Sequence, residues 1–201
     1  LGVDVPILAS NTTPNPDDAG DDALEALFES GRIEDVRVDV LDNGVSVGLF
    51  GLVGDSAAQI TPGVAPAAFE EAEVAAAAAV EALQAMDVDI IIGLSHTGVG
   101  EEGSPAGDEV IAANVPGIDV IVSGHSHTAL QEPRMVGDTV IVQAGAYTRY
   151  LGQLDIVQDE DGGWSAEAYT LHELTDEIPG DPEVTALVAD FVEALEAGPL
   201  A

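Results

Sequence analysis

Two short apolar stretches that each run into histidine constrain the fold of this chain more than any other feature. Residues 89–98 read Asp-Ile-Ile-Ile-Gly-Leu-Ser-His-Thr-Gly, and residues 118–128 read Ile-Asp-Val-Ile-Val-Ser-Gly-His-Ser-His-Thr. A continuous apolar run of this length is typical of a buried parallel strand, and a polar residue just after it lies at the carboxyl edge of the sheet. Three of the four histidines in the chain, His96, His125 and His127, stand at these two points.

The segment between the two runs, residues 99–117, is too long for a hairpin and long enough for a crossover. It holds a turn-rich part at 100–105 and then a stretch at 108–114 that predicts about two helical turns. A strand, a crossover and a second strand imply a parallel pair, and neighbouring parallel strands lie about 4.8 Å apart. We therefore expect His96 and His125 to emerge side by side.

The spacing of His125 and His127 bears on the kind of metal site. In an extended segment, residues i and i+2 point to the same face about 6.5 Å apart. That is wide for two ligands of one zinc ion at ~2.1 Å, but it suits two metals about 3.5–4 Å apart. A single histidine after a strand is more often a satisfied polar residue than a ligand. Three that converge favour a metal site, with His96, His125 and His127 as its ligands.

These residues carry a specific resemblance to a known family. The two histidine stretches, followed by Val142-Gln143-Ala144-Gly145 and by Tyr150-Leu151-Gly152-Gln153-Leu154-Asp155, resemble the calcineurin-like metallophosphoesterases. Within that family they are most similar to the branch of 5'-nucleotidases and 2',3'-cyclic phosphodiesterases. The resemblance extends from Val5 to about residue 157, and the Gly-His-x-His element is its most specific part.

The resemblance implies an α/β chain with a partial metallophosphoesterase fold, a β-sandwich flanked by helices in α/β/β/α layers. Residues 1–176 would be the C-terminal part of the catalytic domain. Residues 177–201 would form a helix that leads toward an absent C-terminal substrate domain. The family's N-terminal half brings an Asp-x-His, a bridging Asp and an Asn-His pair. No Asp-x-His and no Asn-His occurs in this sequence, so we expect a fragment that lacks part of the site.

The resemblance also implies two divalent metal ions, of Mn, Zn or Fe, with His96 and His125 on one and His127 on the other. The function implied is hydrolysis of phosphate esters by metal-activated water, with nucleotides as the expected substrates and nucleotide breakdown as the role. Two alternatives stay open: the same family acting on cyclic phosphate or sulfur esters, or a non-catalytic metal-binding domain. No residue of this chain is assigned to catalysis, and substrate-binding residues stay unknown.

The rest of the chain reads as alternating strands and helices. The alternating segments 36–41 and 45–53 around Asn43-Gly44 predict a hairpin, and the alanine-rich segment 67–86 predicts a long helix. Further expected elements are strands at 5–9 and 139–144, a helix at 21–30, a loop at 54–66, a hairpin formed by 154–158 and 164–171, and a helix that starts at Asp181-Pro182. The apolar stripe of that last helix is more typical of core than of an interface.

Several polar and aromatic residues are left without an assigned role. Asn11 reads as a turn former rather than a site residue, and His172 reads as a surface residue. Tyr147, Arg149 and Tyr150 lie close to the expected site. They are expected either to meet an anionic substrate or to pack on the domain surface.

The charge of the chain bounds its partners. Acidic residues number 38 against four arginines and no lysine, for a formal net charge of −34. Such a chain repels nucleic-acid polymers and anionic membranes. No apolar run reaches the ~18 residues that a membrane span needs. The resemblance leans toward an extracytoplasmic protein, but the first residues do not resemble a signal peptide, so compartment and oligomeric state stay unassigned. The absence of cysteine excludes disulfides and thiolate metal ligands.

The acidic excess predicts adaptation to high salt and a source in a halophilic archaeon. In about 1 M salt the Debye length falls to about 3 Å, which weakens repulsion between the carboxylates. We therefore expect the fold to lose thermal stability when molar KCl is replaced by roughly 0.1 M KCl. Circular dichroism melts at the two concentrations measure this, and equal midpoints would contradict the prediction.

Overall fold

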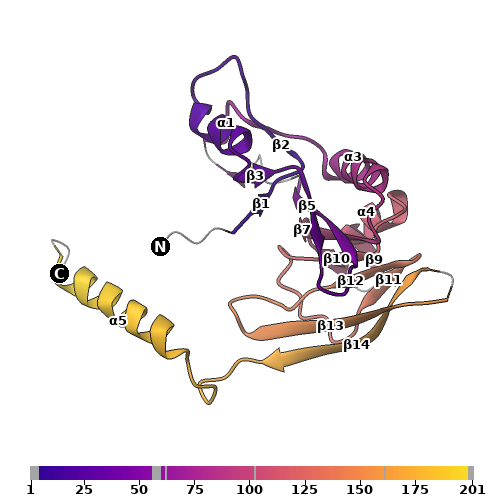
Figure 1. The fold of residues 1–201 in the computed structure, drawn as a ribbon. Coiled ribbons are helices and arrows are strands. Elements are labelled where there is room, and N and C mark those ends of the chain that lie inside the picture. Colours follow the sequence, from indigo (N-terminus) through magenta and orange to yellow (C-terminus); the bar gives the residue numbers. More distant parts are fainter. Residues whose placement is uncertain (1–4, 56–59, 62, 102, 161, 199–201) are drawn as a thin grey trace.

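A six-stranded sheet forms the centre of the fold (Figure 1). The structure is a computed structural model that describes residues 5–55, 60–61, 63–101, 103–160 and 162–198. The strand order is β11-β12-β10-β7-β5-β4. Adjacent pairs among β5, β7, β10 and β12 are parallel, and β4 and β11 are antiparallel edge strands. The strands span β4 (Val36–Val40), β5 (Ser46–Val53), β7 (Ile90–His96), β10 (Val120–Val122), β11 (Arg134–Val136) and β12 (Thr139–Val142).

The two strands that lead into the histidines are neighbours, as predicted. Strands β7 and β10 pair in parallel, with Ile92 opposite Val120 and Leu94 opposite Val122. The crossover between them contains the predicted helix, α4 (Asp108–Asn114). The part expected to be turn-rich is a small hairpin of β8 (Val99–Glu101) and β9 (Ser104–Gly107). Residue 102 in its turn lies outside the described residues.

One face of the sheet is covered by helices. Helix α3 (Ala72–Ala85) packs on β5 and β7, and α4 contacts β12. The buried alanines of α3, among them Ala76 and Ala79, let its backbone approach the sheet closely. In the same core cluster, Phe50 of β5 is 1 % exposed. A Cβ at Gly93 would lie 2.7 Å from Phe50 Cζ, so the sheet needs glycine there to accept this ring.

The other face is covered by a second, two-stranded sheet. The predicted hairpin is β13 (Tyr150–Gln158) paired with β14 (Trp164–Glu173). The turn between its strands includes residue 161, which lies outside the described residues. Three side chains of this hairpin, Leu154, Ile156 and Trp164, pack against a buried apolar cluster on this face of the central sheet. The cluster consists of Ile90, Val120, Val140 and Val142. The described elements therefore supply helix, sheet and sheet layers, which confirms the predicted α/β class with two stacked sheets.

The N-terminal part follows the prediction except at the start of the long helix. Strand β1 (Ile7–Leu8) pairs in parallel with β3 (Ile33–Glu34), and α1 spans Asp22–Glu29. The helix expected at 67–86 begins only at Ala72, because residues 68–69 form β6 (Ala68–Phe69), which pairs with β2 (Thr12–Thr13). The Ala72 N–H donates to Asp55 Oδ1 at 2.8 Å. Residues 56–59 and 62 of the predicted loop lie outside the described residues.

The C-terminal helix extends away from the sheets. Helix α5 (Pro182–Glu196) begins as predicted, because Asp181 Oδ1 accepts hydrogen bonds from the N–H groups of Glu183 and Val184. It projects from the end of β14 (Figure 1), and none of its residues is buried. The expectation that its apolar stripe belongs to the core is therefore wrong.

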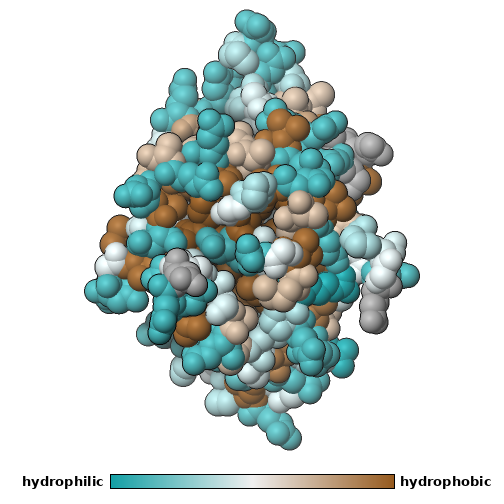
Figure 2. Space-filling view, turned by 90° about the vertical axis from the view of Figure 1, so that its right-hand side faces the viewer, coloured by the Kyte–Doolittle hydropathy of each residue, from teal (hydrophilic) through white to brown (hydrophobic). Residues whose placement is uncertain are grey.

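Hydrophilic side chains cover much of one face of the molecule. Figure 2 shows them spread widely over this face, with hydrophobic side chains in patches between them. None of the helices in the described part of the chain combines the length and apolar character needed to cross a membrane.

Candidate functional site

His96 and His125 lie side by side at the carboxyl edge of the central sheet. Their ring centroids are 5.2 Å apart and the ring planes meet at 73°. Both side chains are exposed. This approach depends on Gly124, since a Cβ there would lie 2.8 Å from His96 Nδ1. The prediction that the parallel pair brings these two histidines together is confirmed.

The loop that carries His125 and His127 differs from the expected extended segment. Strand β10 ends at Val122, and His125 and His127 have φ angles of 64° and 56°. The predicted extended geometry, with residues i and i+2 about 6.5 Å apart on one face, is therefore wrong for His125 and His127. A left-handed backbone costs a residue with a Cβ roughly 1–2 kcal/mol, so contacts elsewhere must hold the loop.

The aromatic residues near the edge divide into two groups. Tyr147, 89 % exposed, lies edge-on to the ring of His127 with centroids 5.3 Å apart. Arg149 instead stacks over the Tyr150 ring at 5.4 Å and lies 4.0 Å from a carboxylate oxygen of Glu173. Packing is the role that these contacts favour for Arg149 and Tyr150, whereas Tyr147 stays open to solvent beside a candidate ligand.

Two other residues behave as the sequence suggested. His172 is exposed, and its Nε2 lies 3.1 Å from Gln153 Oε1. Asn11 is 1 % exposed. Its Nδ2 donates to the carbonyls of Val53 and Glu70, and its Oδ1 accepts from Val53 N–H. Asn11 therefore fixes the end of β5 and is not a site residue.

Gln143, at the end of β12, braces the histidine loop. It is 2 % exposed. Its Oε1 accepts from Ser126 Oγ and from Thr128 N–H, both at 2.9 Å, and its Nε2 donates to the Gly124 carbonyl. These bonds act on both sides of His125 and so restrain its left-handed backbone. No role was predicted for Gln143, although a polar side chain directly after a buried apolar strand is a signal for one.

Asp108, the first residue of α4, is a second buried polar group behind this edge. It is 0 % exposed. Its Oδ1 accepts from Thr97 Oγ1, and its N–H donates to the Gly98 carbonyl at 2.8 Å. Burial raises the pKa of the Asp108 carboxyl, while the hydroxyls of Ser123, Ser95 and Thr97 act in the opposite direction. No sequence signal indicates this role, because an acid at a helix start is normally exposed.

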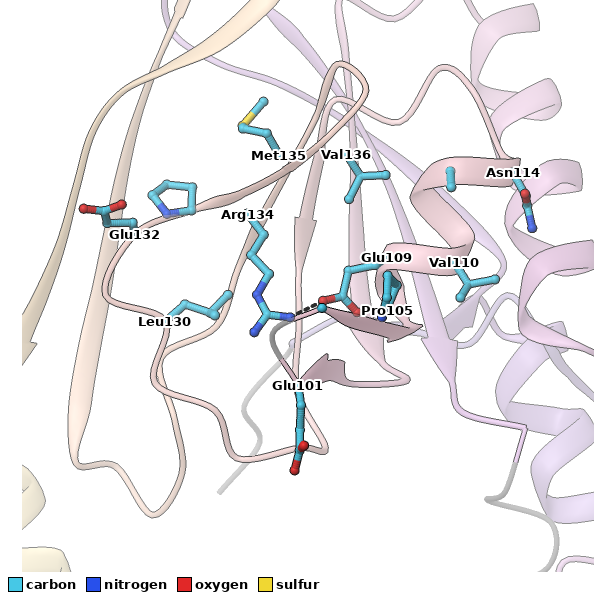
Figure 3. A pocket seen from close by; sticks show the side chains of 13 residues that line it. Glu101, Pro105, Glu109, Val110, Asn114, Leu130, Glu132, Arg134, Met135 and Val136 are labelled. Carbon is cyan, nitrogen blue, oxygen red and sulfur yellow. Dashed lines mark hydrogen bonds and ion pairs between the residues drawn. The ribbon is translucent and has the colours of Figure 1, made fainter.

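The neighbouring acid, Glu109, serves another part of the fold. It is 5 % exposed and paired with Arg134 of β11. Burial alone would raise the pKa of Glu109, but the N–H groups of Gly100 and Ala106, together with Arg134, hold it below its ordinary value. The pair lies in a cavity of about 780 Å³ between α4 and β11 (Figure 3). None of the three candidate histidines lines this cavity.

The donor set at the histidine edge fits only part of a metal centre. Two neighbouring exposed imidazoles offer nitrogen ligands suited to zinc, iron or manganese. Within the described ranges, no group of three or more histidine, aspartate and glutamate side chains is arranged to hold a metal ion. The geometry thus supports a two-imidazole half-site to which other ligands must be added.

The α/β fold of this chain matches that of 5'-nucleotidase-like metallophosphoesterases. A 5'-nucleotidase precursor from Thermus thermophilus aligns with a TM-score of 0.76 and 25 % identity, over 96 % of this chain and 38 % of that one. The trifunctional nucleotide phosphoesterase YfkN of Bacillus subtilis is 34 % identical over 139 residues, which are 67 % of this chain and 9 % of YfkN.

The 5'-nucleotidase of Diplobatis ommata is 26 % identical over 213 residues, 97 % of this chain and 34 % of that protein. No profile of a protein family matches the chain. The sequence relatives and structural neighbours are therefore 5'-nucleotidases and calcineurin-like phosphoesterases. This chain spans well under half the length of each of these three proteins.

The role of Gln143 is testable by substitution. Gln143→Leu removes the partner of Thr128 N–H and of the Gly124 carbonyl, and we expect a loss of unfolding free energy of about 1–3 kcal/mol. Urea unfolding in high salt measures it. Gln153→Leu is the control, since Gln153 is exposed, and it should change stability by less than about 0.5 kcal/mol. Equal effects of the two changes would show that Gln143 does not brace the loop.

Proposed function

We propose that this chain is part of a metal-dependent phosphoesterase that acts on nucleotides, with His96, His125 and His127 as metal ligands. In this proposal residues 1–176 are the C-terminal part of the catalytic domain, and residues 177–201 lead toward a substrate domain. The observation that carries it is the 5.2 Å approach of the His96 and His125 rings at the carboxyl edge of the sheet. That edge is where ligands bind in sheets of this kind.

The chemistry of the edge supports hydrolysis rather than simple binding of an anion. Two divalent ions, of Mn, Zn or Fe, would supply an activated water and neutralise charge on the phosphoryl oxygens. His96, His125 and His127 would supply imidazole nitrogens at this edge. Gln143 holds the loop that carries His125 and His127. Because the chain carries a net charge of −34, an anionic nucleotide needs cations at the site to offset the repulsion.

The remaining ligands are proposed to come from protein outside this chain. On the sheet face that leads to His96, Leu94 and Val122 are each 43 % exposed, although they lie on central strands. Apolar residues on neighbouring strands of a sheet face are normally covered. A segment that packs there would reach the histidines and could bring the carboxylates that neutral imidazoles lack. The greater length of the relatives fits this arrangement.

The alternative function is a non-catalytic metal-binding domain. It is favoured by one observation: among the described residues, no three histidine, aspartate or glutamate side chains are grouped so that they could hold a metal ion. Cyclic phosphate and sulfur esters are the other substrates that the family resemblance allows. Contacts in a substrate domain would decide between them and nucleotides. The halophilic archaeal source and the extracytoplasmic location remain predictions, supported by the acidic excess and by the family resemblance respectively.

The proposal predicts that this chain alone does not turn over substrate, whereas a version extended at both ends does. Without a bridging carboxylate, two cations about 4 Å apart repel each other, so at best one binds, and weakly. Without a placed acid, the leaving group loses a contribution of typically 10²–10⁴-fold. Hydrolysis of AMP, ADP and bis-p-nitrophenyl phosphate with Mn²⁺ or Zn²⁺ in high salt measures this.

The control in this assay is His125→Ala in both lengths of chain. Activity of the short chain that disappears in His125→Ala would show that the additional segments are dispensable and the proposed site is wrong. An extended chain that is folded, binds metal and is inactive on all three substrates would favour the non-catalytic alternative. Activity on bis-p-nitrophenyl phosphate without activity on AMP would favour a cyclic phosphodiester substrate.

A further inference from the structure

One buried carboxyl lies against both loops that carry the neighbouring histidines. Asp108 accepts a hydrogen bond from Thr97 Oγ1, next to His96 in the chain. The hydroxyl of Ser123, two residues before His125, also lowers the pKa of this carboxyl. Asp108 Oδ2 and Ser123 Oγ are both buried, and neither makes a hydrogen bond to any described residue. Each atom therefore keeps bonding capacity that the other could satisfy after a small side-chain rotation.

The backbone holds Asp108 in this place. Gly107 has a φ of 52°, and a Cβ on it would lie 2.2 Å from the Gly98 carbonyl oxygen and 2.7 Å from that of Thr97. Only glycine lets the start of α4 come this close to the residues after His96. The Asp108 N–H then bonds the Gly98 carbonyl at 2.8 Å. The same contact brings the carboxyl under both loops.

A carboxyl in this position is costly for stability alone. Asp108 is 0 % exposed, and burying a carboxylate is unfavourable unless it is fully hydrogen-bonded. No described ion pair involves Asp108, whereas Glu109 beside it is paired with Arg134. Two acids on one helical turn thus serve different parts of the fold. Glu109 ties down the β8–β9 hairpin, and Asp108 faces the ends of β7 and β10.

We propose that Asp108 is a positioning residue that holds the His96 and His125 loops in the relative placement needed to share one cation. The proposal deepens the proposed function and rests on it for the identity of that cation. Asp108 does not touch the cation. It acts through the hydroxyls of Thr97, just after β7, and Ser123, just after β10, which have no described hydrogen bond to each other. Apart from the strand pairing, a hydrogen bond from Val99 N–H to Ser126 Oγ at 3.1 Å also joins the two loops, so loss of the Asp108 link should loosen their relative placement.

The test compares four variants of the chain in high salt: Asp108→Ala, Asp108→Asn, Thr97→Val and Glu109→Gln. Asparagine keeps an acceptor for Thr97 and gains a donor for Ser123, so it should preserve the link. Alanine at position 108 and valine at position 97 each remove it. Glu109→Gln is the matched control, because it weakens a buried interaction on the same turn without touching either histidine loop. Thermal melts report the stability of all four.

The first readout needs no metal. The nuclear Overhauser contact between the ring protons of His96 and His125 should persist in the unmodified chain, Asp108→Asn and Glu109→Gln, and fade in Asp108→Ala and Thr97→Val. The second readout is Zn²⁺ affinity by calorimetry. Asp108→Ala and Thr97→Val should bind about 10–100-fold more weakly, whereas Asp108→Asn and Glu109→Gln should stay within a few-fold of the unmodified chain. If Asp108→Ala does not fold, Thr97→Val against Glu109→Gln decides.

The possible results separate the two proposals. Retention of the ring contact in Asp108→Ala and Thr97→Val, or its loss in Glu109→Gln to the same extent, would overturn the positioning role. A ring contact that follows the expected pattern in a chain that binds no Zn²⁺ would support positioning and count against the proposed metal function. Zn²⁺ binding that depends on His96 and His125 but not on Asp108 would support the proposed metal function and count against the positioning role of Asp108.

Discussion

The parallel pairing of β7 with β10 is the constraint on which the rest of the structure depends. Its register sets Leu94 opposite Val122, so the residues that follow each strand leave the sheet at the same edge. Burial of Ile90, Ile91, Val120 and Ile121 on both faces of the sheet stabilises this register. A slip of one residue would turn these side chains to the opposite faces and move the histidines apart.

Three buried polar side chains convert that edge into a fixed surface. Asn11 holds the end of β5, Asp108 lies against the ends of β7 and β10, and Gln143 braces the loop after β10 from the end of β12. Each reaches backbone or hydroxyl groups that would otherwise be buried without partners. The exposed histidines therefore stand next to a layer of buried, hydrogen-bonded polar side chains.

Features with a local signal were predictable from the sequence, and features set by tertiary contacts were not. The β4–β5 hairpin, the strands β7 and β10 and the cap at Asp181 follow from alternation, apolar runs and capping chemistry. The start of α3 was missed because Ala68 and Phe69 have a distant partner in β2. The left-handed backbone at His125 and His127 was missed because it is imposed by Gln143 and Gly124. Burial of Asp108 could not be inferred from an ordinary helix start.

We propose above that His96 and His125 form half of a metal centre at the edge of the central sheet. Calorimetric titration of Zn²⁺ into the chain in high salt tests it, with His96→Ala, His125→Ala and His172→Ala measured in parallel. We expect one weak site that is lost in the first two variants and unchanged in His172→Ala, because His172 is exposed on β14 and its Nε2 lies against Gln153 Oε1. Binding that survives in both His96→Ala and His125→Ala, or that is lost in His172→Ala, would contradict it.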